Sequence, residues 1–422
     1  MVDAEMLKVF IVGLAIFLCP GYALLATLRG RDFDFAEMCC AAGGLSIVVV
    51  PLMLYVTSCF GVELTPEVVW LLLLPCGGIC LWDSWQRISR PRSQASREMK
   101  VVYALLGLVF LVTLTSRIWM VRDIGYPLWT DSYHHTIITQ LISDQGKIPS
   151  SYEPYAPVDN FTYHFGFHAV SAWFHQLSGL SIPRSVVLTG QIINALAVPG
   201  SFLLGRWLFR NRIAGIVSSV VVGSLSHMPA FFVNWGRYTQ LSGQVFLPVL
   251  MILTMDAFDR RGNRIPNLFA VGVGAAGLFL VHIRVLLFYG FFAALLVMFK
   301  LTSALRRHNT EEIRHLLVSS IVMVGIALAI AAPWLWRFLG GFGSTVAKEL
   351  IGGYQHDRYG TYFRWRTMDL VDYGMPSWLL IIAVAGAVAG LFNSKREVWL
   401  LMLWFLGLLA VANLHVIGLV PP

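Results

Sequence analysis

The feature that most constrains this chain is a series of apolar runs, each near the length that a helix needs to cross a bilayer. A crossing helix takes about 20 apolar residues. Twelve runs can be placed, at 6–28, 36–60, 68–85, 101–120, 185–208, 212–233, 243–258, 267–283, 286–303, 314–336, 378–392 and 397–418. They predict an all-α polytopic membrane protein with about 12 transmembrane helices.

The composition agrees with a membrane solvent. Of the 422 residues, 57% are hydrophobic and 13% are charged, whereas soluble domains carry about 25% charged residues. A soluble fold of this length would need more polar surface, so a cytosolic enzyme, a disordered chain and a disulfide scaffold are excluded. The six cysteines all precede residue 81 and lie in or beside apolar runs, where they are expected to be small helix residues.

Basic residues in short loops predict the orientation of the chain, because such loops usually face the cytoplasm. They cluster at 86–100, 206–212, 259–264, 306–307 and 395–396. All five clusters fall on one side only if the segment 161–180 does not cross. This segment carries four polar side chains that are costly at bilayer depth, His164, His168, His175 and Gln176. We therefore predict an amphipathic interfacial helix lying on the outer surface.

This topology also accounts for the net charge and for the division of the chain. The formal charge of +8 marks cytoplasmic loops, so no nucleic-acid partner is expected. Residues 1–100 form transmembrane helices that precede a core of residues 101–422. Two long external loops follow, at about 121–184 and 337–377, and loops of this length are usually functional. The second begins with a glycine-rich stretch at 340–344 and could order over a bound substrate.

The first external loop contains an acid at the start of a predicted helix. Asp131 precedes an apolar face formed by Ile137, Ile138, Leu141 and Ile142. Thr130, Asp131 or Ser132 can cap such a helix by accepting a backbone hydrogen bond. Two interpretations of Asp131 stay open: a helix cap, or a carboxylate held at the membrane surface as a general base.

The two histidines that follow Asp131 raise the question of a metal. His134 and His135 are adjacent, so on a helix they point about 100° apart and make a poor pair of ligands. Combined with Asp131 they give spacings of three and four residues, which keeps a divalent metal open but not favoured. We predict no cofactor. The alternative is that both are ordinary interfacial histidines.

Further polar groups stand at the predicted outer ends of spans. They are Arg237 and Tyr238 in the turn 234–242, His282 and Arg284 after 267–281, and Arg337 after 314–336. An arginine on the outer side runs against the usual charge bias, and a guanidinium suits a phosphate group. The alternative is that each arginine reaches out to the lipid headgroups.

The run from Trp129 to Gln240 resembles the GT-C-fold glycosyltransferases, and oligosaccharyltransferase catalytic subunits and mannosyl- and arabinosyltransferases in particular. Thr130-Asp131-Ser132-Tyr133-His134 stands where that family has an essential Asp at the start of an interfacial helix. Gly146-Lys147-Ile148-Pro149 matches the end of that helix, 163–178 matches the second interfacial helix, and 205–210 matches the basic turn between two spans. The resemblance covers about a quarter of the chain.

The sequence also departs from the family. Oligosaccharyltransferases hold a metal with paired acids in the next external turn, where this chain has Tyr238-Thr239-Gln240. The departure favours a metal-independent branch. A soluble C-terminal domain of the oligosaccharyltransferase kind is missing as well, so recognition of a peptide acceptor is not expected.

The resemblance implies inverting transfer of a sugar from a polyprenyl-phosphate donor to an acceptor hydroxyl. It places this reaction at the outer face of a prokaryotic plasma membrane. Asp131 would be the base, and Arg237, His282, Arg284 and Arg337 would stabilise the leaving phosphate. The remaining expected substrate contacts are Trp129, Tyr133, His134, His135, Tyr163, His164 and Tyr238. The expected partners are the lipid-linked donor, membrane lipid and, in one alternative, a membrane complex. In that alternative the chain is a non-catalytic subunit, and in another it is a transporter, although no inverted repeat is evident.

Overall fold

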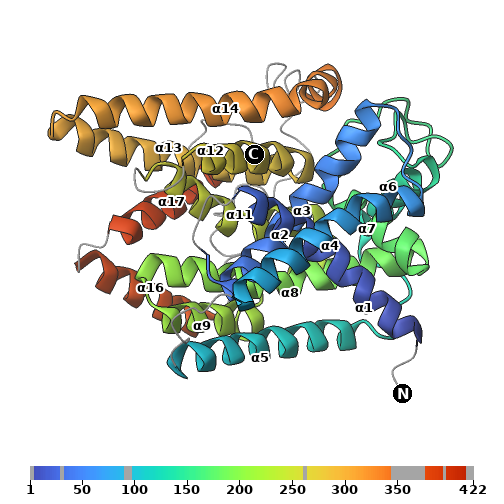
Figure 1. The fold of residues 1–422 in the computed structure, drawn as a ribbon, viewed down its shortest axis with the longest axis horizontal. Coiled ribbons are helices and arrows are strands. Elements are labelled where there is room, and N and C mark those ends of the chain that lie inside the picture. Colours follow the sequence, from blue (N-terminus) through green and yellow to red (C-terminus); the bar gives the residue numbers. More distant parts are fainter. Residues whose placement is uncertain are drawn as a thin grey trace.

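The computed structural model describes residues 4–28, 33–89, 97–259, 264–343, 376–392 and 396–414, and these ranges contain helices but no strand (Figure 1). The N-terminal half contains α1 (Ala4–Phe17), α2 (Cys19–Leu28), α3 (Phe35–Cys59), α4 (Pro66–Ser89), α5 (Arg97–Met120), α6 (Thr130–Gln145), α7 (Gly166–Ser178) and α8 (Ile182–Phe209). The rest contains α9 (Arg212–Val220), a π-helical turn (Val221–Leu225), α10 (Ala230–Asn234), α11 (Tyr238–Ala257), α12 (Arg264–Val281), α13 (Ile283–Arg306), α14 (Thr310–Phe338), a second π-helical turn (Leu339–Gly343), α16 (Ser377–Phe392) and α17 (Arg396–Ala412).

The predicted apolar runs are helical over most of their described residues, and the run 212–233 is interrupted by a turn at 226–229. Within the described ranges, nine helices are long and apolar enough to cross a membrane: Glu5–Leu28, Phe35–Cys59, Pro66–Arg87, Arg97–Met120, Ile182–Phe209, Arg212–Asn234, Tyr238–Ala257, Ile283–Arg306 and Thr310–Gly341. The other three runs form shorter apolar helices, Ile265–Val281, Ser377–Phe392 and Glu397–Ala412. The helical class is therefore confirmed, and the helices are consistent with a membrane protein.

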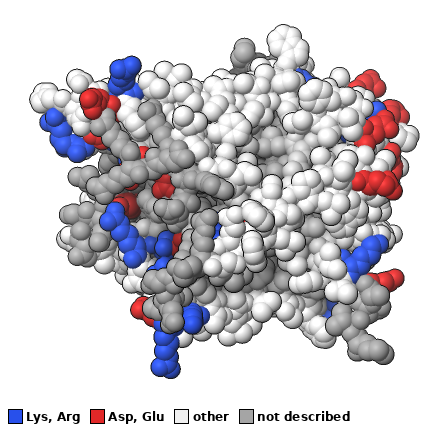
Figure 2. All heavy atoms as spheres, in the orientation of Figure 1, with Lys and Arg blue, Asp and Glu red and all other residues white. Residues whose placement is uncertain are grey.

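The charged side chains divide the molecule into two ends. On the face drawn in Figure 2 they gather at opposite ends of the long helices, with a broad uncharged band between. We call one the α6 end, with α6, α7 and the turn before α11, and the other the basic end, with the start of α5 and the α13–α14 turn (Figure 1). Exposed tryptophans lie at both ends of the molecule. Trp82 and Trp85 are near the C-terminus of α4, and Trp119 is near the C-terminus of α5. Tryptophan is enriched at membrane interfaces, so the band has the character of a bilayer-facing belt.

Three long helices form the centre of the fold. In α3, α8 and α11, 78–83% of the most apolar window is buried, against 17–22% in α4, α5, α13 and α14. The central helices pack closely because small residues let backbones approach: a Cβ on Gly277 of α12 would come within 2.7 Å of Val48 Cβ in α3. α3 contacts α7, α8, α11 and α12, so helices of the two predicted segments share one core. The boundary at residue 100 stays a prediction.

The segment 161–180 behaves differently from the prediction in one respect. Its helix, α7, has 13 residues and is not among the nine candidate spans, as expected. It does not lie on the surface, however, because 11 of those residues are buried. α7 packs against α1, α3, α6, α8 and α12, so neighbouring helices cover its polar side as well as its apolar side. α7 is therefore a buried helix rather than one on the surface of the protein, and its place at the membrane interface stays a prediction.

Candidate functional site

Asp131 lies in the first turn of α6 and does not cap the helix. The N-cap position is Trp129, which makes no side-chain capping bond and has a φ of +74°, a conformation that costs a non-glycine residue free energy. Asp131 lies inside the first turn, so the cap interpretation was wrong. Its carboxylate lies 3.2 Å from the Arg237 guanidinium, and the two side chains are 42% and 51% exposed. The helix ends at Gly146 in the left-handed conformation, as the sequence predicted.

Arg237 reaches Asp131 because the turn before α11 presses against α6. The residue before it, Gly236, has a φ of +62°, which a residue with a side chain adopts only under strain. A Cβ at this position would come within 2.6 Å of Ser132 Oγ and 3.3 Å of Asp131 Cβ. Only glycine permits this approach, and the approach places Arg237 beside Asp131.

A layer of buried histidines lies beneath the Asp131–Arg237 pair. His135 Nδ1 lies 2.8 Å from His168 Nε2, and His135 Nε2 lies 2.8 Å from the Gly236 carbonyl oxygen. His135 and His168 are 2% and 0% exposed. Burial lowers the pKa of His135 to about 3 and holds the pKa of His168 well below its ordinary value. Both rings are therefore neutral at physiological pH.

A second group of rings closes the other side of the site. Tyr163 stacks on His164 with ring centroids 3.9 Å apart, and His164 meets His282 edge to face at 4.7 Å. Burial, followed by the charges of Arg284 and Arg237, lowers the pKa of His282 to about 4. Burial chiefly raises the pKa of Tyr163, and the nearby charges of Asp131, Arg237 and Arg284 also act on it. The charges of Asp131, Arg237 and Arg284 therefore all act on the Tyr163 phenol, and His282 contacts the His164 ring on which Tyr163 stacks.

Other predicted contact residues are engaged elsewhere. Arg337 donates to the carbonyl oxygens of Pro149 and Ser150, at 2.7 and 2.8 Å, and lies over the Trp334 ring. It therefore holds the turn after α6, and the expectation that it joins Arg237 and Arg284 is not met. Tyr238 is 2% exposed and stacks on Phe167.

His134 and His135 point to different partners, as their spacing predicted. The Nε2 atom of His134 lies 3.0 Å from Tyr152 Oη, and the two rings stack. His135 and Tyr238 are each 2% exposed, so neither side chain is open to a substrate as the sequence led us to expect. By contrast, Trp129 and Tyr133 are 62% and 75% exposed and are free to meet a ligand or the lipid headgroups.

Sequence reasoning missed two members of this site, Gly236 and His168. His168 was noted only as a polar residue in an apolar segment, and that mismatch was the signal available. Gly236 stands between an aromatic residue and an arginine in a short turn, which marks a turn but does not reveal what packs against it. Within the described ranges, no group of three or more His, Cys, Asp or Glu side chains is placed to hold a metal ion. Metal independence stays a prediction.

An apolar cavity of about 600 Å³ adjoins this end of the molecule. It is lined by residues of α5, α8 and α10 and of the segment that leads to α6, among them Met120, Val121, Leu128 and Phe231. Arg117 also lines it, and its guanidinium donates to Asn194 Oδ1 at 3.1 Å and to the Gly223 carbonyl at 3.2 Å. An arginine within an apolar helix is costly and is usually retained for function.

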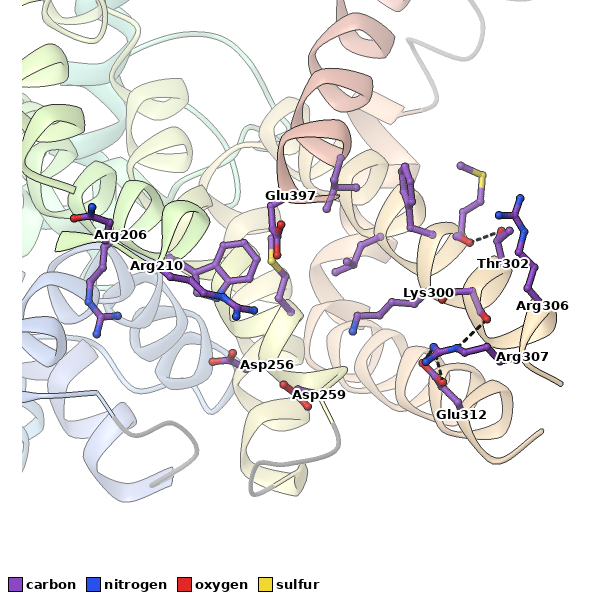
Figure 3. Close-up of a pocket in the computed structure, with 18 of the residues that line it drawn as sticks. Arg206, Arg210, Asp256, Asp259, Lys300, Thr302, Arg306, Arg307, Glu312 and Glu397 are labelled. Carbon is purple, nitrogen blue, oxygen red and sulfur yellow. Dashed lines mark hydrogen bonds and ion pairs between the residues drawn. The ribbon is translucent and has the colours of Figure 1, made fainter. Parts of the chain in front are cut away.

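A larger cavity, of about 1490 Å³, lies at the basic end, among the ends of α8, α11, α13, α14 and α17 (Figure 3). Six basic and five acidic side chains line it: Arg206, Arg210, Arg212, Lys300, Arg306, Arg307, Glu98, Asp256, Asp259, Glu312 and Glu397. One pair of these, Arg307 and Glu312, is joined at 3.1 Å. The nearly balanced charges favour neither an anion nor a cation, so size alone does not make this cavity the better candidate.

The chain was compared with known proteins. No curated protein and no solved structure matches it. The profile of DUF6541, described as a family of unknown function, matches residues 14–419, and the chain therefore belongs to this family.

Proposed function

We propose that this chain is a multi-pass membrane glycosyltransferase with a GT-C-like core of about 12 spans, in a prokaryotic plasma membrane. It moves a sugar from a polyprenyl-phosphate donor to an acceptor hydroxyl at the outer face. The observation that carries the proposal is the Asp131–Arg237 pair at 3.2 Å, with the charges of Asp131, Arg237 and Arg284 acting on Tyr163 and with His282 beside His164, on which Tyr163 stacks. A carboxylate beside fixed positive groups suits a reaction in which a proton is removed and an anion leaves.

The chemistry assigns a separate role to each charge. The Asp131 carboxylate accepts the proton of the acceptor hydroxyl, while the acceptor oxygen forms a bond to the anomeric carbon. The bond from that carbon to the donor phosphate breaks, and its electron pair stays on the phosphate oxygen. Arg237 and Arg284 stabilise this oxygen, and His282 is a neutral hydrogen-bonding group because burial lowers its pKa to about 4.

The cavity beside Arg117 supports a lipid-linked donor. Its wall includes α5, which exposes most of its apolar window, so a prenyl chain could enter from the bilayer without crossing water. The exposed rings of Trp129 and Tyr133, at the start of α6, suit stacking against a sugar. These contacts would align the donor with the carboxylate of Asp131, and alignment supplies a large part of catalysis.

The test is sugar transfer by the full-length protein in lipid vesicles. The probes are undecaprenyl-phosphate hexoses and pentoses, and the measured product is released polyprenyl phosphate. Asp131→Asn should lower the transfer rate by roughly 10²–10⁴-fold, the usual contribution of a general base, and leave insertion and melting unchanged.

The matched control is Asp123→Asn. Asp123 lies in the same loop, pairs with Arg122 at 3.2 Å and is 80% exposed, so this variant should transfer at the wild-type rate. Transfer by Asp131→Asn at that same rate would remove the base from the proposal.

A non-catalytic subunit of a membrane complex is the second candidate. The observation that favours it is the ion pair itself, because Asp131 already has a partner in Arg237 at 3.2 Å, as a structural carboxylate would. Native mass spectrometry of the protein from its own membrane distinguishes the two. A stoichiometric protein partner without transfer activity supports the subunit, and an active monomer excludes it.

A further inference from the structure

A line of hydrogen bonds connects two buried histidines to the turn that carries Arg237. His135 stands four residues after Asp131, so both lie on the same face of α6. Its ring lies between His168 Nε2 and the carbonyl oxygen of Gly236, each at 2.8 Å. Neither imidazole is exposed enough to meet a ligand directly, since His135 is 2% and His168 0% exposed.

The partners decide where the protons are. A carbonyl oxygen can only accept, so His135 carries its proton on Nε2 and donates it to Gly236. His135 Nδ1 is then a lone pair, which accepts from the Nε2–H of His168. With His168 Nε2 donating to His135, the Nδ1 atom of a neutral His168 carries no proton. One sequence of donors and acceptors therefore runs from His168 through His135 to Gly236, with both rings neutral.

The accepting carbonyl belongs to the peptide that joins Gly236 to Arg237. A peptide is planar, so holding its oxygen also fixes the direction in which the chain continues into Arg237. The same glycine packs against Asp131 and Ser132 at distances that leave no room for a Cβ. His135 is thus tied to Asp131 through one turn of helix and to Arg237 through one hydrogen bond.

We propose that His135 is a positioning residue that holds the Arg237 guanidinium beside the Asp131 carboxylate, with His168 fixing its tautomer. The geometric role stands on these contacts, and its consequence for sugar transfer rests on the proposed function. A neutral histidine suits this role, because a charged ring beneath Arg237 would repel the guanidinium. Burial lowers the pKa of His135 to about 3, so the ring keeps its neutral form at physiological pH.

The first experiment reads the tautomer in the unaltered protein. Full-length protein labelled with [15N]histidine, in lipid vesicles, is examined by solid-state NMR between pH 7 and pH 5. We expect a neutral ring with the proton on Nε2 throughout, assigned to His135 because His135→Gln removes its signals. A proton on Nδ1, or a ring that becomes charged within this range, overturns the proposal.

The second experiment reads the position of Arg237. Dipolar recoupling between aspartate carboxyl 13C and arginine guanidinium 15N reports every close pair, and the share that disappears in Arg237→Lys belongs to Asp131–Arg237. His135→Leu should lose that share, whereas His135→Gln, which can still donate to Gly236 and accept from His168, should keep it. His134→Leu is the matched control, because His134 faces Tyr152 instead, and it should keep the contact. A contact retained in His135→Leu overturns the positioning role.

These measurements do not depend on sugar transfer. If the NMR contacts are as expected and no donor is used, the proposed function fails and the positioning role stands. If transfer is found, His135→Leu should lower kcat with little change in KM, and His135→Gln should restore most of it. An unchanged kcat in His135→Leu would overturn the catalytic consequence.

Discussion

The two ends of the molecule use charged side chains in different ways. At the basic end, Arg206 and Glu37 form an ion pair at 2.5 Å in which the acid is only 3% exposed. Glu37 also completes the capping box of α3 with Asp34. At the α6 end, Asp131 and Arg237 are each about half exposed, and the buried groups beneath them are neutral histidines.

The difference separates a charge that stabilises helices from one that is available for chemistry. A buried carboxylate that pairs with a cation and also caps a helix is not available to bind a substrate. An exposed acid, held by a neutral support, can exchange its partner for a ligand. The following predictions test this contrast, beginning with the largest expected effect.

Glu37→Ala should destabilise the protein more than any change at the α6 end. It leaves the Arg206 guanidinium without its carboxylate, and breaking a largely buried pair costs about 3–5 kcal/mol. Thermal unfolding of the detergent-solubilised protein measures the effect. Asp131→Asn is the comparison variant, expected to melt near the wild type, and equal losses for the two would show that both pairs are structural.

Gly236→Ala should disturb the site through the backbone. The positive φ and the contact of a new Cβ with Ser132 Oγ at 2.6 Å together cost roughly 1–3 kcal/mol. Because the turn must move away from α6, we expect the Asp131–Arg237 contact to be lost as well. Gly125→Ala, where an added Cβ meets nothing within 4 Å, is the control. A wild-type contact in Gly236→Ala would refute the close-approach argument.

Acidification should weaken the α6 end. The folded-state pKa values of His135 and His282 are lowered to about 3 and about 4, so below the ordinary value of 6.5 the unfolded state binds more protons. The contribution of these histidines to the free energy of unfolding is then fully present above pH 6.5. It decreases as the pH falls toward 4, by roughly 1 kcal/mol per histidine over the first pH unit. Across this range, the melting temperature of His135→Gln should change less with pH than that of the wild type. Equal pH dependence of the melting temperature in the wild type and in His135→Gln would contradict the prediction.

Arg307→Ala should have the smallest effect. In its pair with Glu312, the Arg307 side chain is 60% exposed. Such surface pairs contribute about 0–1 kcal/mol to stability. A loss as large as that of Glu37→Ala would show that burial does not decide the strength of pairs at the basic end. Unfolding midpoints of the two variants, measured in the same detergent, give the comparison.

The helical part of the fold could be predicted because it depends on local composition. Each apolar run was long enough to specify a helix, and the end of α6 at Gly146 matches the position that the resemblance implied. The surroundings of α7 could not be predicted in this way. Its polar residues suggested that one face of the helix contacts water. Other helices cover that face instead, and Ala169, Ser171 and Ala172 are all 0% exposed. Periodicity shows which sides of a helix differ, but not what covers them.

The site could be predicted only as a set of residue types. The chain shows Asp131, Arg237, His282 and Arg284 as polar groups near predicted span ends, and three-dimensional packing brings them together. Arg337 has the same sequence character and is engaged by the Pro149 and Ser150 carbonyls instead. Sequence spacing could not separate these cases, because the residues lie far apart along the chain.

The apolar helices follow from the amino-acid sequence alone, because they depend on local hydrophobicity, and the side of the bilayer that the basic loops face stays a prediction. Three-dimensional packing was needed to show that Trp129, rather than Asp131, occupies the N-cap position of α6 and that His135 is buried. The burial of His135 accompanies the close approach of the turn at Gly236 to α6, since the His135 ring bonds to the Gly236 carbonyl oxygen. Such an approach depends on the shapes of segments about 100 residues apart, and no local pattern records it.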